Sequence, residues 1–147
     1  MSVKTVVFVC TGNYYRSRFA EGLFNHLARQ RRLSWQAQSC GLGVGRAETT
    51  NVGPIAADTI EAFKQRSIPV SEPIRYPRAA TLKDFTSADL VIALKEAEHR
   101  ALMRQQFPDW TDRITYWHVH DLDQAPAHIA LQEIERLVRA LIPRLSR

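Results

Sequence analysis

Short apolar runs alternate with longer stretches of helical periodicity along this chain of 147 residues. The clearest run, Val6-Val7-Phe8-Val9, is unbroken and mostly β-branched, which is typical of a strand buried on both faces of a parallel sheet. A later stretch places Phe19, Leu23 and Leu27 on one side of a helix. The whole pattern predicts strands at residues 5–9, 35–39, 89–94 and 114–119, and helices at residues 17–31, 54–66, 95–107 and 127–143.

Strands that alternate with helices predict a parallel sheet with helices on both of its faces. The length and the 45% content of hydrophobic residues suffice for one full core, and no internal repeat suggests a second unit. We therefore expect a single α/β domain over residues 1–147. Residues 67–86 lack a regular period and carry Pro69, Pro73 and Pro77, so they are expected to form a surface excursion beside the functional site.

The first predicted strand leads directly into Cys10, a five-residue loop and Arg16. A thiolate at the mouth of such a loop can attack phosphorus while an arginine fork holds the phosphate oxygens. The helix that follows directs its N-terminal amides and positive dipole end at the loop, which favours a bound anion. Gly12 and Asn13 help the loop to turn its amides inward, and Ser17 can donate a hydrogen bond to the thiolate or cap the helix. The pattern indicates a cysteine-dependent phosphatase.

The spacing between cysteine and arginine is not decisive by itself, because Cys40 and Arg46 have the same separation. However, Gln36-Ala37-Gln38-Ser39 is a weaker strand ending than the residues before Cys10. The Gly53-Pro54 pair after Arg46 indicates a loop where the first match has a helix. We therefore assign the nucleophile to Cys10 and expect Cys40 to be a small buried residue.

The run Val9-Cys10-Thr11-Gly12-Asn13, followed by Arg16-Ser17 and Ala20-Glu21, resembles the signature of the low-molecular-weight protein tyrosine phosphatases. Ser39-Cys40-Gly41-Leu42-Gly43 is similar to a second element of that family, and the segment from Arg78 to Phe85 is similar to a third. The resemblance extends over nearly the whole chain. It implies a Rossmann-like (flavodoxin-like) three-layer fold with strand order 2-1-3-4, in which the cysteine loop lies at the topological switch point.

The resemblance also implies an activity and its residues. It implies hydrolysis of phosphotyrosine or aryl phosphate monoesters through a phosphocysteine on Cys10, with no metal or other cofactor. Ser39 is implied as a residue that supports the loop. The residues implied to bind the phosphate are Thr11, Gly12, Asn13, Tyr14, Tyr15, Arg16 and Ser17.

The general acid of the family is an aspartate on a late loop, usually in an Asp-Pro pair. Asp121 is the candidate here, because it follows a run of strand-forming residues that is expected to end beside the cysteine loop. Leu122 stands in place of the proline, so Asp123 remains a competitor for the role. The resemblance leaves both aspartates open.

Several positions depart from the family pattern. Tyr15 stands where many members have a second loop cysteine, and Arg18 stands where a proline usually begins the helix. Lys95 replaces an aspartate, and Arg75 falls near a position where some members have histidine. One of the rings of Tyr14 and Tyr15 either lines the mouth and stacks on an aryl phosphate or narrows the mouth.

Two other functions remain open. Arsenate reductases share the scaffold, but such an enzyme requires Cys40 or an external thiol to complete its relay, and the sequence does not reveal whether Cys10 and Cys40 can pair. The departures at Tyr15, Arg18 and Leu122 also leave room for a protein that binds phosphate and turns it over weakly or not at all.

Charge and composition define the expected partners. The formal charge is +5, and the densest basic cluster, Arg29-Gln30-Arg31-Arg32, lies where the first helix is expected to end and complements its dipole. We therefore expect no nucleic-acid partner and interpret the charge as attraction for anionic substrates. The expected partners are a phosphorylated protein or a small phosphoester, and inorganic phosphate.

No apolar run is long enough to span a membrane, and the first residues lack the features of a signal peptide. With two cysteines, this composition predicts a cytoplasmic protein without membrane contact, and we expect a monomer or weak dimer. His118 and His120 share a strand face, but no third ligand is convincingly placed, so no metal site is expected.

Overall fold

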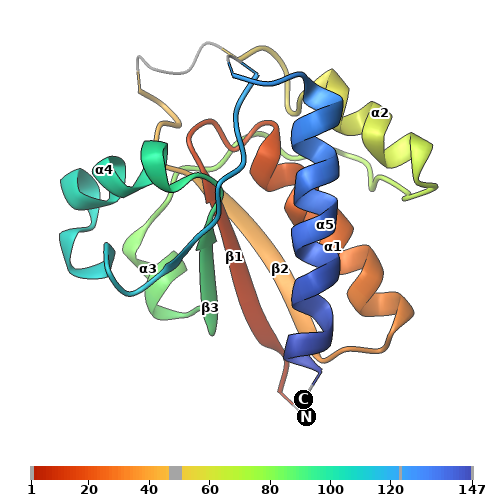
Figure 1. The fold of residues 1–147 in the computed structure, drawn as a ribbon, viewed down its shortest axis with the longest axis horizontal. Coiled ribbons are helices and arrows are strands. Elements are labelled where there is room, and N and C mark those ends of the chain that lie inside the picture. The colour runs from red at the N-terminus through yellow and green to blue at the C-terminus, as the bar shows by residue number, and fades with distance from the viewer. Residues whose placement is uncertain (1, 47–50, 123, 147) are drawn as a thin grey trace.

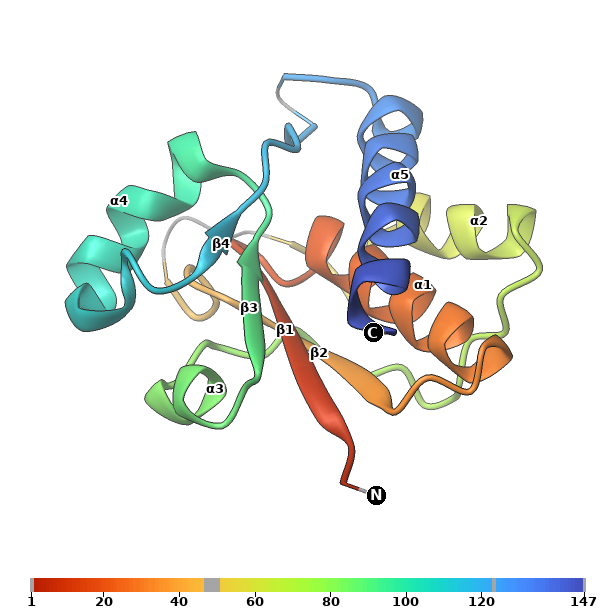
Figure 2. The same cartoon turned by 60° about the horizontal axis from the view of Figure 1, so that its bottom comes forward.

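The computed structural model describes residues 2–46, 51–122 and 124–146. A parallel sheet forms the centre of the molecule (Figure 1), and its strand order β2-β1-β3-β4, which can be followed in Figure 2, confirms the predicted topology. The sheet consists of β1 (Lys4–Cys10), β2 (Trp35–Gly41), β3 (Leu90–Ala93) and β4 (Thr115–Tyr116).

Helices cover both faces of the sheet, as Figure 2 shows. On one face lie α1 (Arg16–Gln30) and α5 (Ala127–Leu145), with α2 (Ala57–Gln65) packed against them. On the other face lie α3 (Leu82–Thr86), α4 (Glu96–Gln106) and the 3₁₀ turn η1 (Pro108–Trp110). Among the described residues, no helix has the length and apolar character needed to cross a membrane.

The alternation of side chains along β1 divides the core into two layers. Val6 and Phe8 point toward α1 and α5, where the Phe8 ring contacts Phe24 and Trp117. Val7 and Val9 point toward the opposite layer. Because both faces of β1 are covered, the strand is continuously apolar instead of alternating.

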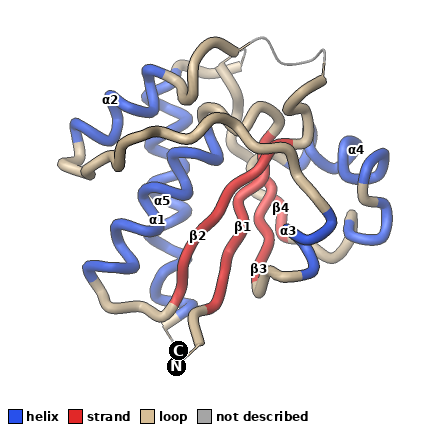
Figure 3. The backbone as a smooth tube through the Cα atoms, turned by 180° about the vertical axis from the view of Figure 1, so that it is seen from behind, coloured by secondary structure: helices blue, strands red, loops and turns tan. Residues whose placement is uncertain are grey.

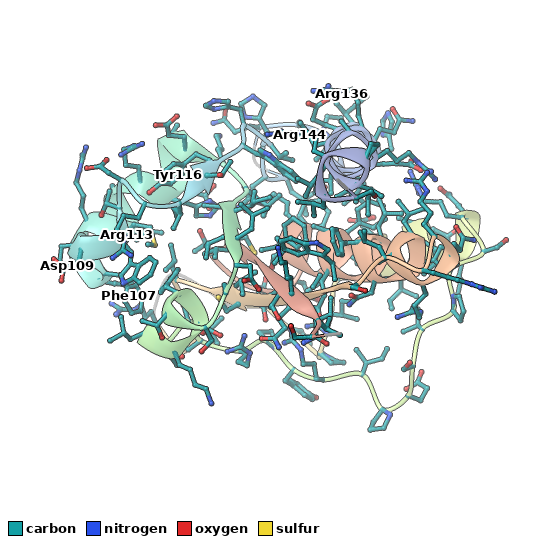
Figure 4. All side chains as sticks on the ribbon, turned by 90° about the horizontal axis from the view of Figure 1, so that it is seen from below. Phe107, Asp109, Arg113, Tyr116, Arg136 and Arg144 are labelled. Atoms are coloured by element: carbon teal, nitrogen blue, oxygen red, sulfur yellow. The ribbon has the colours of Figure 1, made fainter. Side chains whose placement is uncertain are left out.

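The second layer includes a group of aromatic rings around Phe85. The Phe85 ring lies 4.7 Å from the Phe107 ring and 6.0 Å from the Trp110 ring, measured between centroids. The guanidinium of Arg113 lies over Trp110. Figure 4 shows Phe107, Arg113 and Tyr116 gathered at this end of the molecule, far from α5. These rings pack on the face of the sheet that α3 and α4 cover.

Two predicted elements differ from their expected bounds more than the others do. The strand predicted at residues 114–119 is limited to Thr115–Tyr116, and beyond it His118 pairs with Lys95 in an isolated antiparallel bridge. The helix predicted at residues 54–66 begins at Ala57. The backbone just before that helix is bonded to the cysteine loop instead, since Ala56 N–H donates to Tyr14 O.

The predicted irregular excursion at residues 67–86 is correct only in part. Its last five residues form α3, which begins with a capping box between Thr81 and Asp84 and buries Phe85. A helix this short has no visible period, and that is why the sequence pattern did not reveal it. The rest of the segment is irregular and crosses the edge of β2 (Figure 3), where Ala79 pairs with Gly41 at the carboxyl end of that strand.

We expect Phe8→Ala to lower the free energy of unfolding by about 3–5 kcal/mol, because it leaves a cavity between the sheet and two helices. Urea unfolding followed by circular dichroism measures this loss. Leu82→Ala, at an exposed position, is the control and should change stability by less than about 0.5 kcal/mol. A loss below about 1 kcal/mol in the Phe8 variant would contradict the described packing.

Candidate active site

Cys10 is the last residue of β1, and the loop that follows it returns to its sulfur. Asn13 N–H donates to Cys10 Sγ at 3.2 Å, and Ser17 Oγ lies 2.9 Å from the same sulfur. The residue is only 2% exposed. A backbone amide and a hydroxyl thus both contact this sulfur, which fixes its position at the start of the loop.

Asn13 holds the loop in shape through its side chain. Its backbone has φ 47°, in the left-handed region, and the side chain is fully buried. Its Nδ2 donates to Ser17 Oγ at 2.8 Å and to Ser39 Oγ at 2.9 Å. Its Oδ1 accepts from the Arg75 guanidinium and from Arg78 N–H, each at 2.9 Å. One asparagine thus joins the loop to α1, to β2 and to the segment before α3.

The carboxyl end of β2 supports the loop from the other side. Leu42 N–H donates to Cys10 O at 2.9 Å, and Gly43 N–H donates to Thr11 O at 2.8 Å. Gly41 permits this approach, because a Cβ at that position would lie 2.5 Å from Thr11 O. The glycine-containing segment at the end of β2 therefore holds the first two residues of the cysteine loop in place.

Arg18 is buried and donates to three backbone carbonyls. Its Nη1 contacts Asn13 O at 3.3 Å and Pro54 O at 2.9 Å, and its Nη2 contacts Arg75 O at 2.8 Å. Burial, together with the charge of Arg75, lowers the pKa of Arg18 to about 10. The arginine that replaces the family's proline therefore ties three segments together around the loop.

Arg16 is 2% exposed, and its guanidinium is held at both of its terminal nitrogens. Nη1 donates to Val119 O at 3.0 Å, and Nη2 donates to Glu98 Oε2 at 2.8 Å. Asp121 Oδ2 lies 3.4 Å from the same Nη2. The structure therefore brings Asp121 to Arg16, whereas Asp123, its competitor, lies outside the described residues.

Sequence reasoning missed Glu98 at this site. Glu98 lies in the first turn of α4, which begins directly after β3 at the same edge of the sheet as Cys10 (Figure 3). The sequence offered one signal for it: Glu98 is an acidic residue soon after the strand predicted at residues 89–94, which lies beside the first strand in the sheet. Many acidic residues occupy first helical turns for reasons of the dipole alone, so that signal did not single it out.

The two loop tyrosines have different surroundings. Tyr15 is buried, and its hydroxyl donates to Ala127 O at 3.3 Å. Burial, with a smaller effect of the nearby Asp121 charge, raises the pKa of Tyr15 to about 12. Tyr14 is half-buried, and its hydroxyl donates to Val52 O at 2.7 Å. Tyr15 is thus a packing residue, whereas the Tyr14 ring is only partly buried against the same core.

Cys40 lies on the face of the sheet opposite to Cys10. It pairs in register with Val9 and packs in the second core layer, whereas Cys10 belongs to the first. Burial raises the pKa of the Cys40 thiol well above its usual range. A disulfide requires the two Cβ atoms to point toward each other, so these two thiols do not form one in this arrangement.

His118 and His120 share the segment that follows β4. Over residues 2–46, 51–122 and 124–146, no group of three or more His, Cys, Asp or Glu side chains is arranged to hold a metal ion. His118 Nε2 instead lies 3.8 Å from Glu96 at the surface.

Known proteins of similar sequence and structure include several phosphatases. Residues 5–147 match the family described as low molecular weight phosphotyrosine protein phosphatase. The chain is similar to the protein-arginine-phosphatase of Bacillus subtilis, with 28% identity over 97% of each sequence. It is similar to an arsenate reductase of Staphylococcus aureus, with 38% identity over 48% of this chain and 46% of the relative. Its structure is similar to a low molecular weight protein tyrosine phosphatase from T. tengcongensis, with TM-score 0.79, 27% identity, and coverage of 96% of this chain and 99% of the other.

We expect Asn13→Ala and Asn13→Gly both to lower the free energy of unfolding by about 2 kcal/mol or more, because each removes the buried side-chain hydrogen bonds. The alanine variant should be about 1 kcal/mol less stable than the glycine variant, because the backbone is left-handed at this position. Chemical denaturation of both variants tests this order. The exposed Asn51→Ala is the control, and an alanine variant at least as stable as the glycine variant would contradict the strained geometry.

Proposed function

The chain belongs to the low molecular weight phosphotyrosine protein phosphatase family and is a phosphatase, and we propose that it hydrolyses phosphotyrosine or aryl phosphate monoesters through a phosphocysteine on Cys10. The observation that carries the proposal is the environment of the Cys10 sulfur, which contacts Asn13 N–H and the Ser17 hydroxyl. The ion pair between Arg16 and Asp121 at the same edge of the sheet supplies a phosphate-binding fork and a carboxyl group.

In the first step, the Cys10 thiolate attacks phosphorus, so a sulfur–phosphorus bond forms as the bond to the leaving oxygen breaks. Arg16 and the amides of residues 11–17 bind the equatorial oxygens and stabilise the charge that develops on them. The protonated carboxyl of Asp121 gives its proton to the leaving phenolate. The product of this step is a phenol, and the phosphoryl group stays on sulfur.

In the second step, the Asp121 carboxylate removes a proton from water, and the water oxygen attacks phosphorus. The sulfur–phosphorus bond breaks, inorganic phosphate leaves, and the Cys10 thiolate and the protonated Asp121 are restored. Arg16 keeps its role in both steps, since the equatorial oxygens carry the same charge in each.

Arsenate reduction with an internal disulfide is a poorer fit. Such a relay needs a second thiol that can reach the sulfur of Cys10, and Cys40 lies on the opposite face of the sheet. Phosphate binding without turnover is the other alternative. The departures at Tyr15 and Arg18 do not favour it by themselves, because both side chains are accommodated by hydrogen bonds to backbone carbonyls.

A second substrate class, phosphoarginine in proteins, has one specific observation in its favour. The carboxylates of Glu98 and Asp121 both lie beside Arg16, with 27% and 43% of their side chains exposed. Two carboxylates at the mouth suit a cationic guanidinium leaving group. The relative in Bacillus subtilis is named for that activity. Phosphotyrosine and phosphoarginine peptides assayed side by side would rank the two classes.

We expect turnover of p-nitrophenyl phosphate in the presence of EDTA, and a loss of about 10³-fold or more in Cys10→Ser. Asp121→Asn should lower kcat by about 10²-fold, because the phenolate then leaves without a proton. Asp123→Asn is the matched control and should retain activity. Full activity of the Cys10 variant would end the proposal, and a larger loss in the Asp123 variant than in the Asp121 variant would reassign the acid.

We expect Tyr14→Ala to lower kcat/KM for aryl phosphates about fivefold, because a stacking contact contributes on the order of 1 kcal/mol. Tyr14→Phe keeps the ring but loses the hydrogen bond to Val52, so it should retain the wild-type rate. For β-glycerophosphate, which has no aromatic ring, kcat/KM should change little in either variant. Unchanged aryl phosphate kinetics in the alanine variant would count against stacking.

A further inference from the structure

Glu98 has three donors directed at one of its carboxylate oxygens. Oε2 accepts from Arg16 Nη2 at 2.8 Å and also from the Thr11 hydroxyl, and it lies 3.0 Å from His99 Nε2. Two of these donors, Arg16 and Thr11, belong to the loop and helix start that are proposed to bind phosphate. The third comes from α4, the helix that carries Glu98 itself.

The neighbouring His99 acts as a fixed donor. It is completely buried, and its Nδ1 accepts from Lys95 N–H at 3.1 Å. A neutral imidazole with its acceptor on Nδ1 carries its proton on Nε2, the nitrogen that faces Glu98 and lies 3.1 Å from Thr11 Oγ1. Burial lowers the pKa of His99, which keeps the ring in this neutral form.

These contacts keep Glu98 ionised. Burial alone would raise the pKa of Glu98, but the hydrogen bonds from His99 and Arg16 and the Arg16 charge hold it well below its usual range. A carboxyl group with so low a pKa is not a proton donor near neutral pH. Its chemistry at this site is therefore that of a permanent anion between Arg16, Thr11 and His99.

We propose that Glu98 is a positioning residue of the phosphate site, one that sets the orientation of the Arg16 guanidinium and the Thr11 hydroxyl before a phosphate arrives. The inference rests on the proposed function of the loop. Val119 O and Glu98 hold the two terminal nitrogens of Arg16, and two such contacts fix the plane of a guanidinium that has five N–H groups.

This arrangement lowers the cost of organising the site during the reaction. A buried arginine without a fixed partner must reorient when the phosphoryl oxygens gain charge, whereas one that is already held does not. Displacing Glu98 to make room for phosphate would give up three hydrogen bonds, one of them to a completely buried ring. Glu98 therefore stays in place beside the bound phosphate and does not compete with it.

The experiment compares Glu98→Ala and Glu98→Gln with the wild-type protein. Glu96→Gln is the matched control, because Glu96 lies in the same helical turn but pairs with Arg100 and leaves Arg16 untouched. For each protein we would measure kcat and KM with p-nitrophenyl phosphate, the affinity for inorganic phosphate by titration calorimetry, and the thermal unfolding midpoint.

We expect kcat of Glu98→Ala to fall about tenfold or more and its affinity for inorganic phosphate to weaken several-fold. In Glu98→Gln, kcat and phosphate affinity should lie between those of Glu98→Ala and the wild type, because the amide oxygen still accepts a hydrogen bond from Arg16. Glu96→Gln should stay within about twofold of the wild type, as an exposed ion pair contributes little. If Glu98→Ala only destabilised the fold, its unfolding midpoint would fall, and kcat and phosphate affinity would not be partly restored in Glu98→Gln.

Two results would overturn the proposal. One is unchanged kcat and unchanged phosphate affinity in Glu98→Ala. The other is tighter phosphate binding in either variant, because it would make Glu98 a competitor for Arg16. If Glu98→Ala does not fold, Glu98→Gln decides by the same criteria. Absence of turnover in the wild-type protein would instead refute the proposed phosphatase mechanism, and the phosphate affinities would still report on Glu98.

Discussion

The left-handed backbone of Asn13 is the constraint on which the site depends. An L-residue in that conformation costs on the order of 1 kcal/mol, and the buried side chain offsets the cost with hydrogen bonds to Ser17, Ser39 and Arg75. The turn at this residue is what directs its amide at the Cys10 sulfur. The contacts from the end of β2 hold the residues just before that turn, through Cys10 O and Thr11 O.

Two buried arginines on the same helix serve different purposes. Arg18 donates to the backbone carbonyl oxygens of Asn13, Pro54 and Arg75, so it ties three segments of the backbone together. Arg16 is balanced by Glu98 and lies near Asp121. A cation that must bind a dianion benefits from a fixed partner, because removing it from water without one is costly. The charge of this helix start is therefore divided between a structural role and a proposed catalytic one.

The alternation of hydrophobic residues predicted the element order, and the strand, loop and helix around Cys10 predicted which of two similar cysteine spacings forms the loop. Asp121 was proposed from resemblance and the expected position of a strand end, and the structure places its carboxylate 3.4 Å from Arg16 Nη2. The length of β4 was not predictable, because it depends on its pairing with β3. Neither was α3, which is set by a capping box and one buried phenylalanine.

The sequence alone determined the parallel α/β fold and the identity of the candidate nucleophile, because both depend on local patterns: a buried strand, a glycine-containing loop and a helix start. Only the tertiary structure decided the partners of Arg16 and Asn13. Glu98 is separated from Arg16 by 82 positions, and Arg75 from Asn13 by 62. It also decided that Cys10 and Cys40 lie on opposite faces of the sheet. Strand pairing brings such distant residues together, and no local pattern encodes which of many similar side chains will meet.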